Sequence, residues 1–297
     1  MSSIVSGYHM VLLHPAGAVA LRQRNLMIAS VVLMLLIIVP VLAAIAVVAW
    51  RYRASAKNSH YDPRWEHSTK VELMVWAAPL LIIIALGAMT WIGTHQLDPY
   101  RRVDSTDYPR VIAPGVAPLR VEVVSLDWKW LFLYPDYGIA TVNELAAPVN
   151  TPIDFELTSA TMMNSFFVPT LAGQIYTMPG MQTVLHAVID QPGVYRGFSA
   201  NYSGNGFTDM RFRFLGMTDT DFKRWLSGIR AGGGDLDRRA YQALARPSRG
   251  APVRHYARYS PDLYTRILNR CVSAGRMCMA RMMAIDAAGG RPATGHQ

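Results

Sequence analysis

Two long runs without charge, close to the N-terminus, limit most strongly what this chain can fold into. Residues 26–50 contain no charged side chain, and residues 73–94 contain none either. A helix rises about 1.5 Å per residue, so each run is long enough to cross a hydrocarbon layer of about 30 Å. The sequence predicts a transmembrane hairpin over residues 25–95, in which these runs are the spans and residues 51–72 are the connecting loop.

The charge of the connecting loop predicts how the hairpin is oriented. Its basic residues outnumber its acidic ones, and they are Arg51, Arg53, Lys57, Arg64 and Lys70. Short loops rich in Lys and Arg stay in the cytoplasm. We therefore expect both termini, including the N-terminal segment of residues 1–24, on the periplasmic or outer side of a bacterial inner membrane. The first span is too long for a cleaved signal peptide, so we expect it to be retained.

The formal net charge of +9 could favour either nucleic acid or an anionic lipid surface as a partner. The basic residues are scattered, with groups beside the first span and over the C-terminal part of the chain. None of these groups has the pattern of a Lys- and Arg-rich recognition helix. We therefore exclude nucleic acid and expect the lipid bilayer as a partner.

The two cysteines, Cys271 and Cys278, are too few for a disulfide framework or for a metal site made of cysteines alone. On one helix, seven residues would separate them by about 10 Å of rise, which is too far for a disulfide. We expect two ordinary thiols.

After the spans, the pattern changes to that of an exported β-domain. Residues 96–118 are rich in Pro, Asp and Arg and indicate a linker. Apolar residues then alternate with polar ones in several short stretches that Gly and Pro turns separate, which predicts a β-sandwich or Greek-key barrel over residues 119–217. In the last stretch the period of two places Met210 on the same face as Phe212 and Phe214, so we expect it in the core.

The residues that follow have a helical pattern. A first helix is expected where Asp219, Thr220 or Asp221 can act as its cap, and Gly232-Gly233-Gly234 ends it. A second begins near Ser260-Pro261-Asp262. We expect a helical C-terminal region over residues 218–285 and a disordered tail over residues 286–297.

Few residues could carry chemistry, because a nucleophile with its base, a phosphate-binding loop and a zinc signature are all absent from the sequence. Gly204-Asn205-Gly206 reads as a turn. His186 reads as a packed or solvated strand histidine. The segment Asp127-Trp128-Lys129-Trp130 is expected to be a strand whose rings pack on the membrane-proximal surface or on a partner, with an electron-entry surface as the less favoured alternative.

The hairpin, the outward β-domain, the Trp128-Lys129-Trp130 segment and the segment from Asn164 to Arg213 resemble subunit II of the haem-copper oxidases. The implied fold class is membrane α plus β: a two-helix transmembrane hairpin, an exported cupredoxin-like Greek-key β-barrel and a short helical C-terminal extension. In the cytochrome c oxidase branch this barrel holds a binuclear copper centre that receives electrons from cytochrome c. Its ligands are a His and a Cys-x-Glu-x-Cys-x-x-x-His-x-x-Met run.

None of the six ligand residues is present here. The first His position holds Asn164, the Cys positions hold Tyr202 and Gly206, the Glu position holds Gly204, the second His position holds Met210 and the Met position holds Arg213. These side chains cannot build a dicopper centre, which needs soft thiolate ligands. We expect no metal, cofactor or catalytic residue in this chain.

The residues that replace the copper ligands, together with their neighbours, resemble those of another branch, the ubiquinol oxidases of the cytochrome bo type. The similar segments are Met163-Asn164-Ser165-Phe166-Phe167, Gln174-Ile175-Tyr176 and the stretch from Gly138 to Glu144. The resemblance implies a structural and assembly subunit of a proton-pumping oxidase, with the haems, the active-site copper and the quinol site in subunit I. Small membrane subunits III and IV are further expected partners. The alternatives are a free-standing membrane-anchored cupredoxin-like assembly or binding protein, and a cytochrome c oxidase subunit II.

Bacterial relatives in this family are often lipoproteins, with a Cys that closes a Leu-Ser-Gly-Cys box ahead of the first span. Here Val5-Ser6-Gly7 is followed by Tyr8. We therefore expect either that the chain is not lipidated or that the natural start lies upstream.

Overall fold

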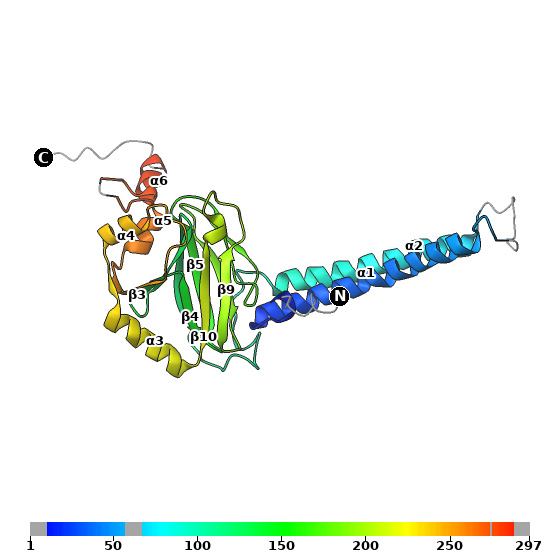
Figure 1. Ribbon diagram of the computed structural model, residues 1–297, viewed down its shortest axis with the longest axis horizontal. Coiled ribbons are helices and arrows are strands. Elements are labelled where there is room, and N and C mark those ends of the chain that lie inside the picture. Colours follow the sequence, from blue (N-terminus) through cyan, green and yellow to red (C-terminus); the bar gives the residue numbers. More distant parts are fainter. Residues whose placement is uncertain (1–10, 57–66, 274, 288–297) are drawn as a thin grey trace. The chain divides into compact units, whose positions relative to one another are not determined.

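The computed structural model describes residues 11–56, 67–273 and 275–287. These residues divide into two compact units (Figure 1). One unit comprises Arg22–Asp98, and the other joins the described residues up to Leu21 with those from Pro99 onward. The segment Val5-Ser6-Gly7-Tyr8, where the family's lipoprotein box is missing, and nearly all of the predicted disordered tail lie outside the described residues.

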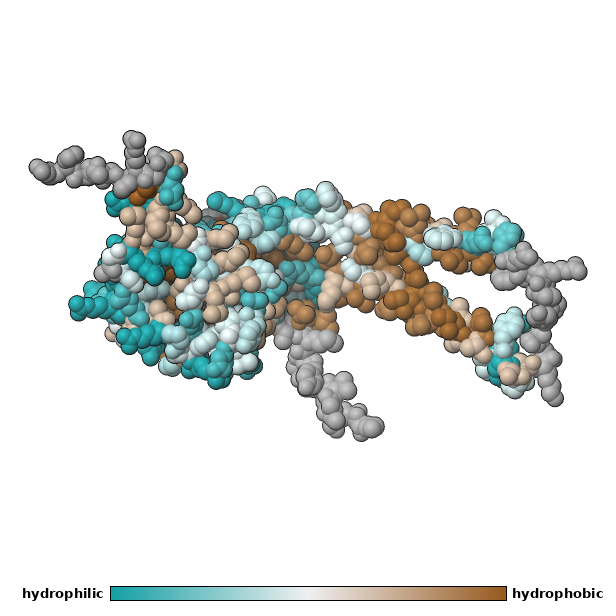
Figure 2. Space-filling view, turned by 90° about the horizontal axis from the view of Figure 1, so that it is seen from above, coloured by the Kyte–Doolittle hydropathy of each residue, from teal (hydrophilic) through white to brown (hydrophobic). Residues whose placement is uncertain are grey.

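The first unit contains the predicted helical hairpin. Helix α1 is Ala18–Arg51 and helix α2 is Thr69–Gln96. Both are long and apolar enough to cross a membrane, with mean hydropathies of 3.3 and 2.2 over their most apolar windows. Their surface is almost entirely hydrophobic (Figure 2). Gly93 lets the two helices approach closely, because a Cβ there would lie 2.9 Å from Leu26 Cδ2.

The start of α1 belongs to the second unit, and the residues just before it are hydrogen-bonded within that unit. The amide of Ala16 donates to the carbonyl of Thr170 over 2.9 Å, and Gly17 forms a β-bridge with Ile189. Gly17 is required at this close approach, since a Cβ would lie 2.7 Å from the carbonyl oxygen of Leu171. The helix therefore begins at Ala18, seven residues before Asn25.

The second unit contains the predicted β-domain, and its described strands form two sheets. The order of the seven-stranded sheet is β11-β12-β3-β2-β1-β5-β8, and that of the five-stranded sheet is β4-β10-β9-β6-β7. The strands are β1 Leu119–Leu126, β2 Lys129–Tyr134, β3 Ile139–Val142, β4 Glu144–Pro148, β5 Pro152–Ser159, β6 Asn164–Phe167, β7 Ile175–Thr177, β8 Thr183–Val188, β9 Gly193–Ser199, β10 Arg211–Met217, β11 Gly234–Leu236 and β12 Arg254–Tyr259. This arrangement confirms the cupredoxin-like prediction.

Aromatic rings fill the space between the two sheets. Trp130 of β2 and Phe212 of β10 both contact Phe166 of β6, with ring centroids 5.4 Å and 5.3 Å apart. Gly197 on β9 makes room for Phe212, because a Cβ there would lie 2.0 Å from the ring. Met210 is fully buried beside this core. Its predicted place on the buried side is therefore confirmed.

The C-terminal region contains the expected helices: α3 Asp219–Gly232, α4 Arg238–Leu244, α5 Leu263–Leu268 and α6 Met279–Ala287. The cap of α3 is Thr218, one residue before the predicted candidates, and its hydroxyl accepts from the amide of Asp221. The region also supplies β11 and β12, which extend the larger sheet beyond β3. The sequence pattern missed β12 because its arginines and aromatic residues are only partly buried and show no apolar alternation.

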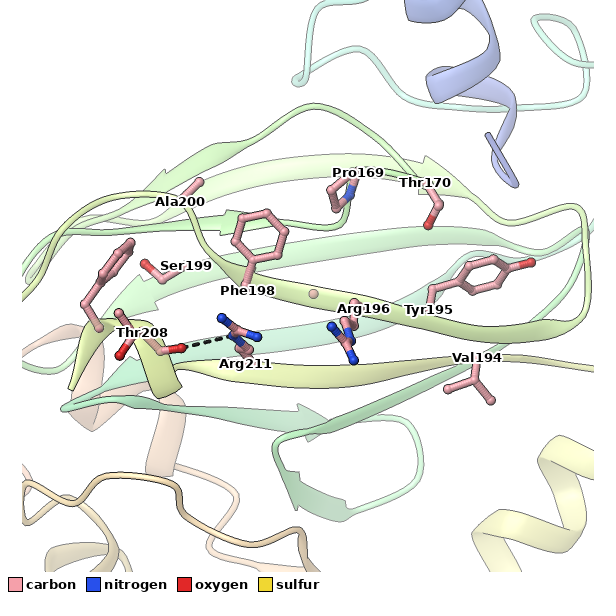
Figure 3. A pocket seen from close by; sticks show the side chains of 12 residues that line it. Pro169, Thr170, Val194, Tyr195, Arg196, Phe198, Ser199, Ala200, Thr208 and Arg211 are labelled. Atoms are coloured by element: carbon pink, nitrogen blue, oxygen red, sulfur yellow. Dashed lines mark hydrogen bonds between the residues drawn. The ribbon is translucent and has the colours of Figure 1, made fainter. Parts of the chain in front are cut away.

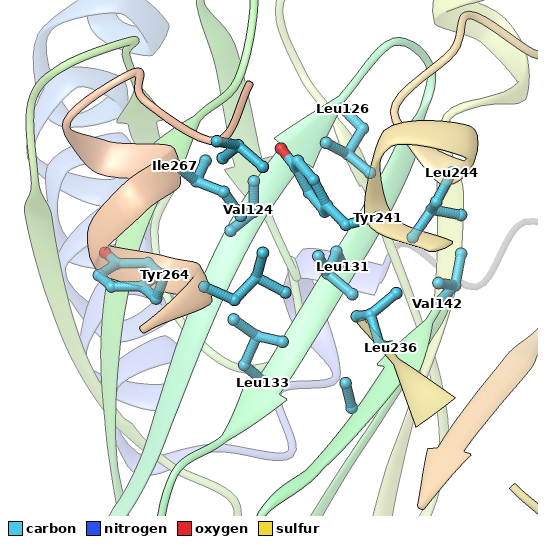
Figure 4. Packing of buried hydrophobic residues seen from close by; sticks show 13 residues of the cluster. Val124, Leu126, Leu131, Leu133, Val142, Leu236, Tyr241, Leu244, Tyr264 and Ile267 are labelled. Carbon is cyan, nitrogen blue, oxygen red and sulfur yellow. The ribbon is translucent and has the colours of Figure 1, made fainter. Parts of the chain in front are cut away.

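These helices cover the outer face of the larger sheet. Tyr241 and Leu244 of α4, together with Tyr264 and Ile267 of α5, pack on apolar side chains of β1, β2 and β3 (Figure 4). Every residue of β2 is buried as a result. The larger sheet therefore has a core on each face.

The expectation of two ordinary thiols is wrong, because Cys271 and Cys278 form a disulfide. Helix α5 ends at Leu268, and Arg270 takes a positive φ of 56° that reverses the chain. The two Cα atoms then lie 4.8 Å apart, whereas one continuous helix would have separated them by about 10 Å. Disulfides persist in oxidising compartments, in agreement with an exported domain.

Two carboxyl groups lie opposite each other on the larger sheet. Strands β1 and β5 run parallel with Glu122 opposite Glu156. Burial, and next the charge of Glu156, raise the pKa of Glu122 to about 7. A raised pKa means that the stability contributed by protonated Glu122 is fully present below its ordinary value of 4.5 and is lost as the pH rises through 7.

We predict that Glu122→Gln removes part of the pH dependence of folding. The wild-type domain should lose about 2 kcal/mol of stability between pH 5 and pH 8, an amount reduced by the partial exposure of the side chain. Urea unfolding of the full chain in mild detergent, followed by tryptophan fluorescence, measures this loss. Glu156→Gln should reduce the slope only partly, and an unchanged slope in Glu122→Gln would contradict the assignment.

Candidate functional site

The first ligand position holds a buried amide that the surrounding side chains satisfy. Asn164 begins β6 and is 2% exposed. Its Oδ1 accepts from the hydroxyl of Ser199 over 3.2 Å, and its Nδ2 donates to the carbonyl of Met162 over 3.3 Å. Ser125 and Thr177 complete the cluster, with 2.9 Å between their hydroxyl oxygens. This amide–hydroxyl network has the hydrogen bonds that a buried polar group needs.

Gly204 and Gly206, which occupy two of the family's ligand positions, leave room for an indole ring. A Cβ at Gly206 would lie 2.4 Å from Cδ2 of Trp128, and one at Gly204 would lie 3.2 Å from its Cζ2. The ring is fixed by a hydrogen bond of 2.9 Å from its Nε1 to the carbonyl of Ser203. Trp128 therefore fills the volume into which side chains at these two positions would project.

The sharp turn before β2 places Trp128 there. Leu126 and Lys129 are paired across β1 and β2, so that Asp127 and Trp128 form a two-residue hairpin loop. Trp128 has a φ of 64°, which non-glycine residues adopt rarely. The predicted strand is confirmed for Lys129 and Trp130, which begin β2, and is wrong for Asp127 and Trp128, which form the turn. Trp130 is buried in the core, whereas Trp128 is partly exposed and lies on the glycine loop.

The three remaining positions lie apart from one another. Tyr202 is 76% exposed. Met210 is buried, and its carbonyl accepts from the amide of Ser199, the residue that also contacts Asn164. Arg213 lies on the face of β10 opposite to the core. The structure thus connects Asn164 with Met210 through Ser199 and joins the two glycines through Trp128, whereas Arg213 points elsewhere.

These residues do not fit a dicopper thiolate centre. Within the described ranges, no three His, Cys, Asp or Glu side chains come together as metal ligands could. The thiols are joined in the distant disulfide, and His186 is a packed strand histidine bonded to Asp154 over 2.7 Å. The residues at these positions can support the local fold, but they offer no set of donor atoms that would bind copper.

Comparisons with known proteins agree with this geometry. The family of the cytochrome c oxidase subunit II periplasmic domain matches residues 138–213, and the COX aromatic rich motif matches residues 230–275. The cytochrome bo(3) ubiquinol oxidase subunit 2 of Pseudomonas putida is 47% identical, over 90% of this chain and 82% of the relative. The ubiquinol oxidase subunit 2 of Acetobacter aceti is 43% identical, over 89% and 84%. The chain belongs to the ubiquinol oxidase subunit 2 family.

A solved structure matches part of the chain at lower identity. The periplasmic domain of subunit II of cytochrome oxidase of Bradyrhizobium japonicum is 22% identical, with a TM-score of 0.36, over 38% of this chain and 94% of that domain.

In this member of the ubiquinol oxidase subunit 2 family, Arg213 belongs to a cluster that the sequence analysis missed. It donates to Glu144 Oε2 over 2.6 Å, and the other oxygen of Glu144 accepts from Trp225 over 3.1 Å and from His255 over 2.8 Å. These four residues come from β10, β4, α3 and β12. One buried carboxylate therefore connects the smaller sheet to the C-terminal region.

The charge of Glu144 is stabilised although the side chain is buried. Burial alone would raise its pKa, but the hydrogen bonds from Trp225 and His255, with the charges of His255 and Arg213, outweigh it and hold the pKa below its ordinary value. A long sequence separation conceals this cluster, because Arg213 lies 69 residues from Glu144 and His255 lies 111. No local motif could have revealed it.

A second residue whose role the sequence did not indicate is Lys129, a cation buried between the larger sheet and helix α4. It is 1% exposed, and its Nζ donates to the carbonyls of Leu244 over 3.0 Å and Arg246 over 2.8 Å. These carbonyls lie at the C-terminal end of α4, where the helix dipole favours a positive charge. Burial lowers the pKa of Lys129. The lysine thereby holds α4 against the sheet.

We predict that Gly206→Ala destabilises the domain by about 1–3 kcal/mol, because the methyl group and Trp128 cannot occupy the same space. Chemical unfolding of the full chain measures the effect. In a Trp128→Ala background the same substitution should cost less than about 0.5 kcal/mol. Gly228→Ala, in the open part of α3, is the matched control and should be neutral or slightly stabilising. Equal costs of Gly206→Ala in the two backgrounds would refute the contact.

We predict that Glu144→Gln costs about 2 kcal/mol at pH 7, because it leaves Arg213 and His255 without their anion. The lowered pKa means that the stabilisation is present above the ordinary value of 4.5 and is lost as the pH falls through the lower folded value. The difference between wild type and variant should therefore shrink in acid. Asp235→Asn removes an exposed ion pair with Arg258 and should cost less than about 1 kcal/mol. Equal losses of stability in Glu144→Gln and Asp235→Asn would contradict this role of Glu144.

Proposed function

We propose that this chain is the non-metal-binding subunit II of a proton-translocating respiratory ubiquinol oxidase. The observation that carries the proposal is the filled ligand site. Trp128 lies on the glycines at two ligand positions, and the amide–hydroxyl network surrounds Asn164 at another. Membership of the ubiquinol oxidase subunit 2 family supports the same function.

The electron donor explains why such a subunit needs no copper. Cytochrome c is soluble in water and delivers electrons at the outer surface, where a copper relay must receive them. Ubiquinol dissolves in the membrane and can reduce the haem-bearing subunit directly. A relay in the exported domain then has no task, and the family positions Asn164, Tyr202, Gly204, Gly206, Met210 and Arg213 keep a structural role.

The proposed contribution of this chain to the complex is structural. Subunit I supplies the haems, the oxygen-reducing copper, the quinol site and the proton path. Helices α1 and α2 brace that subunit within the membrane, and the β-domain covers its outward side, with both chain termini outside. The two cores of the larger sheet support this role, because a sheet packed on both faces resists deformation. Small subunits III and IV complete the assembly.

Purification in mild detergent tests the proposal. The tagged full chain should co-purify with haem proteins, and the preparation should consume oxygen with ubiquinol as the electron donor. Metal analysis should find no copper beyond that of the oxygen-reducing site, and the near-infrared band of a mixed-valence copper pair should be absent.

Three results would contradict the proposal. Recovery of the chain without haem would favour a free-standing cupredoxin-like protein. Oxygen uptake driven by reduced cytochrome c would favour a cytochrome c oxidase. Copper bound tightly and in fixed proportion to the isolated chain would show that the filled site can still hold a metal.

A further inference from the structure

A groove of about 780 Å³ lies on the outer face of the smaller sheet, and its lining includes Phe207 and Arg211, the chain neighbours of Gly206 and Met210. We call it the outer groove. Residues Val194–Ala200, most of which belong to β9, line its floor, and Pro169, Thr170, Phe207, Thr208 and Arg211 line its sides. Figure 3 shows the side chains around it. Nothing in the proposed function uses this face.

Two guanidinium groups give the outer groove a positive charge. Arg196 and Arg211 both line it, and among the described residues their side chains make one hydrogen bond, from Arg211 Nε to the carbonyl of Thr208 over 3.0 Å. Across the described part of the chain, no ion pair joins either residue to a carboxylate. Paired strands place Arg196 directly opposite Arg213, which Glu144 neutralises. The positive charge in the groove is therefore uncompensated.

Apolar surface adjoins these charges. Val194 is 69% exposed, and Phe198 lines the groove on the same face of β9, with Arg196 between the two. Most of the surface that lines the groove is apolar. A concave site with two cations and an apolar floor fits an anion that carries a hydrophobic part, whereas free phosphate would gain nothing from Val194 and Phe198.

One side of the groove is tied to the start of the first membrane helix. Thr170, which lines the groove, accepts a hydrogen bond from Ala16, and α1 begins at Ala18. The uncharged run starts at Asn25, only seven residues later, which is about 10 Å along a helix. The headgroup region of a bilayer extends several ångströms beyond its hydrocarbon layer. Only a short stretch of chain therefore separates Ala16, the partner of Thr170, from the start of the uncharged run.

We propose that the outer groove binds an anionic phospholipid of the outer leaflet. Its phosphodiester lies between Arg196 and Arg211, and its apolar part lies on Val194 and Phe198. Arginine binds phosphate oxygens through paired N–H groups, and a basic site close to a membrane attracts anionic headgroups. The site does not depend on which electron donor the oxidase uses.

Native mass spectrometry of the full chain in mild detergent, with all subunits that accompany it, tests the proposal. The sample is titrated with phosphatidylglycerol or with phosphatidylcholine. Wild type should retain phosphatidylglycerol in preference, and Arg196→Gln/Arg211→Gln should bind it about tenfold more weakly. Arg196→Lys/Arg211→Lys keeps the charge and should bind within about threefold of wild type.

The matched control is Arg238→Gln/Arg239→Gln, which removes the same charge from exposed positions on α4 outside the groove. It should leave lipid binding unchanged. Equal retention by all four proteins would overturn the proposal. So would displacement of the lipid by inorganic phosphate, which would identify a free-anion site. Loss of the haem subunits from Arg196→Gln/Arg211→Gln alone would identify the groove as a protein interface and would also overturn it.

Discussion

Burial of the larger sheet on both of its faces is the constraint on which the rest of the exported domain depends. Strand β2 has aromatic rings on one side and the C-terminal helices on the other, and none of its residues is exposed. A charged side chain in that position is costly unless hydrogen-bond partners satisfy it. Lys129 meets this requirement through the carbonyls at the end of α4. The C-terminal region is therefore part of the folded core and more than an appendage to a barrel.

The same constraint explains what replaces copper chemistry in this fold. A loop shaped to present ligands would leave a void if its ligands were merely lost, and voids between packed elements are destabilising. Here the hairpin turn before β2 brings the indole of Trp128 onto the two glycines, and hydroxyl groups surround Asn164. The absence of side chains at Gly204 and Gly206 is thus a packing requirement of the tryptophan.

The sequence predicted those parts of the structure that depend on local periodicity. The two spans follow from uncharged length, and the buried side of Met210 follows from alternation with Phe212. The prediction from sequence failed where the chain reverses direction. The positive φ of Trp128 converts an apparent strand into a turn, and that of Arg270 brings Cys271 to its disulfide partner. Such conformations depend on tertiary contacts, which no periodic pattern encodes. The Glu144 cluster was hidden for a related reason, because its members are distant in sequence.

The pairing of β9 with β10 shows how one sheet separates a structural charge from a free one. Arg196 and Arg213 lie directly opposite each other, an arrangement that is unfavourable for like charges. Glu144 removes that conflict at Arg213, where Trp225 and His255 also bind the carboxylate. Since this carboxylate is already fully used, it cannot neutralise Arg196 as well. The interaction that joins the C-terminal region to the barrel therefore leaves the neighbouring arginine without a carboxylate partner among the described residues, which is the charge that the proposed anion would compensate.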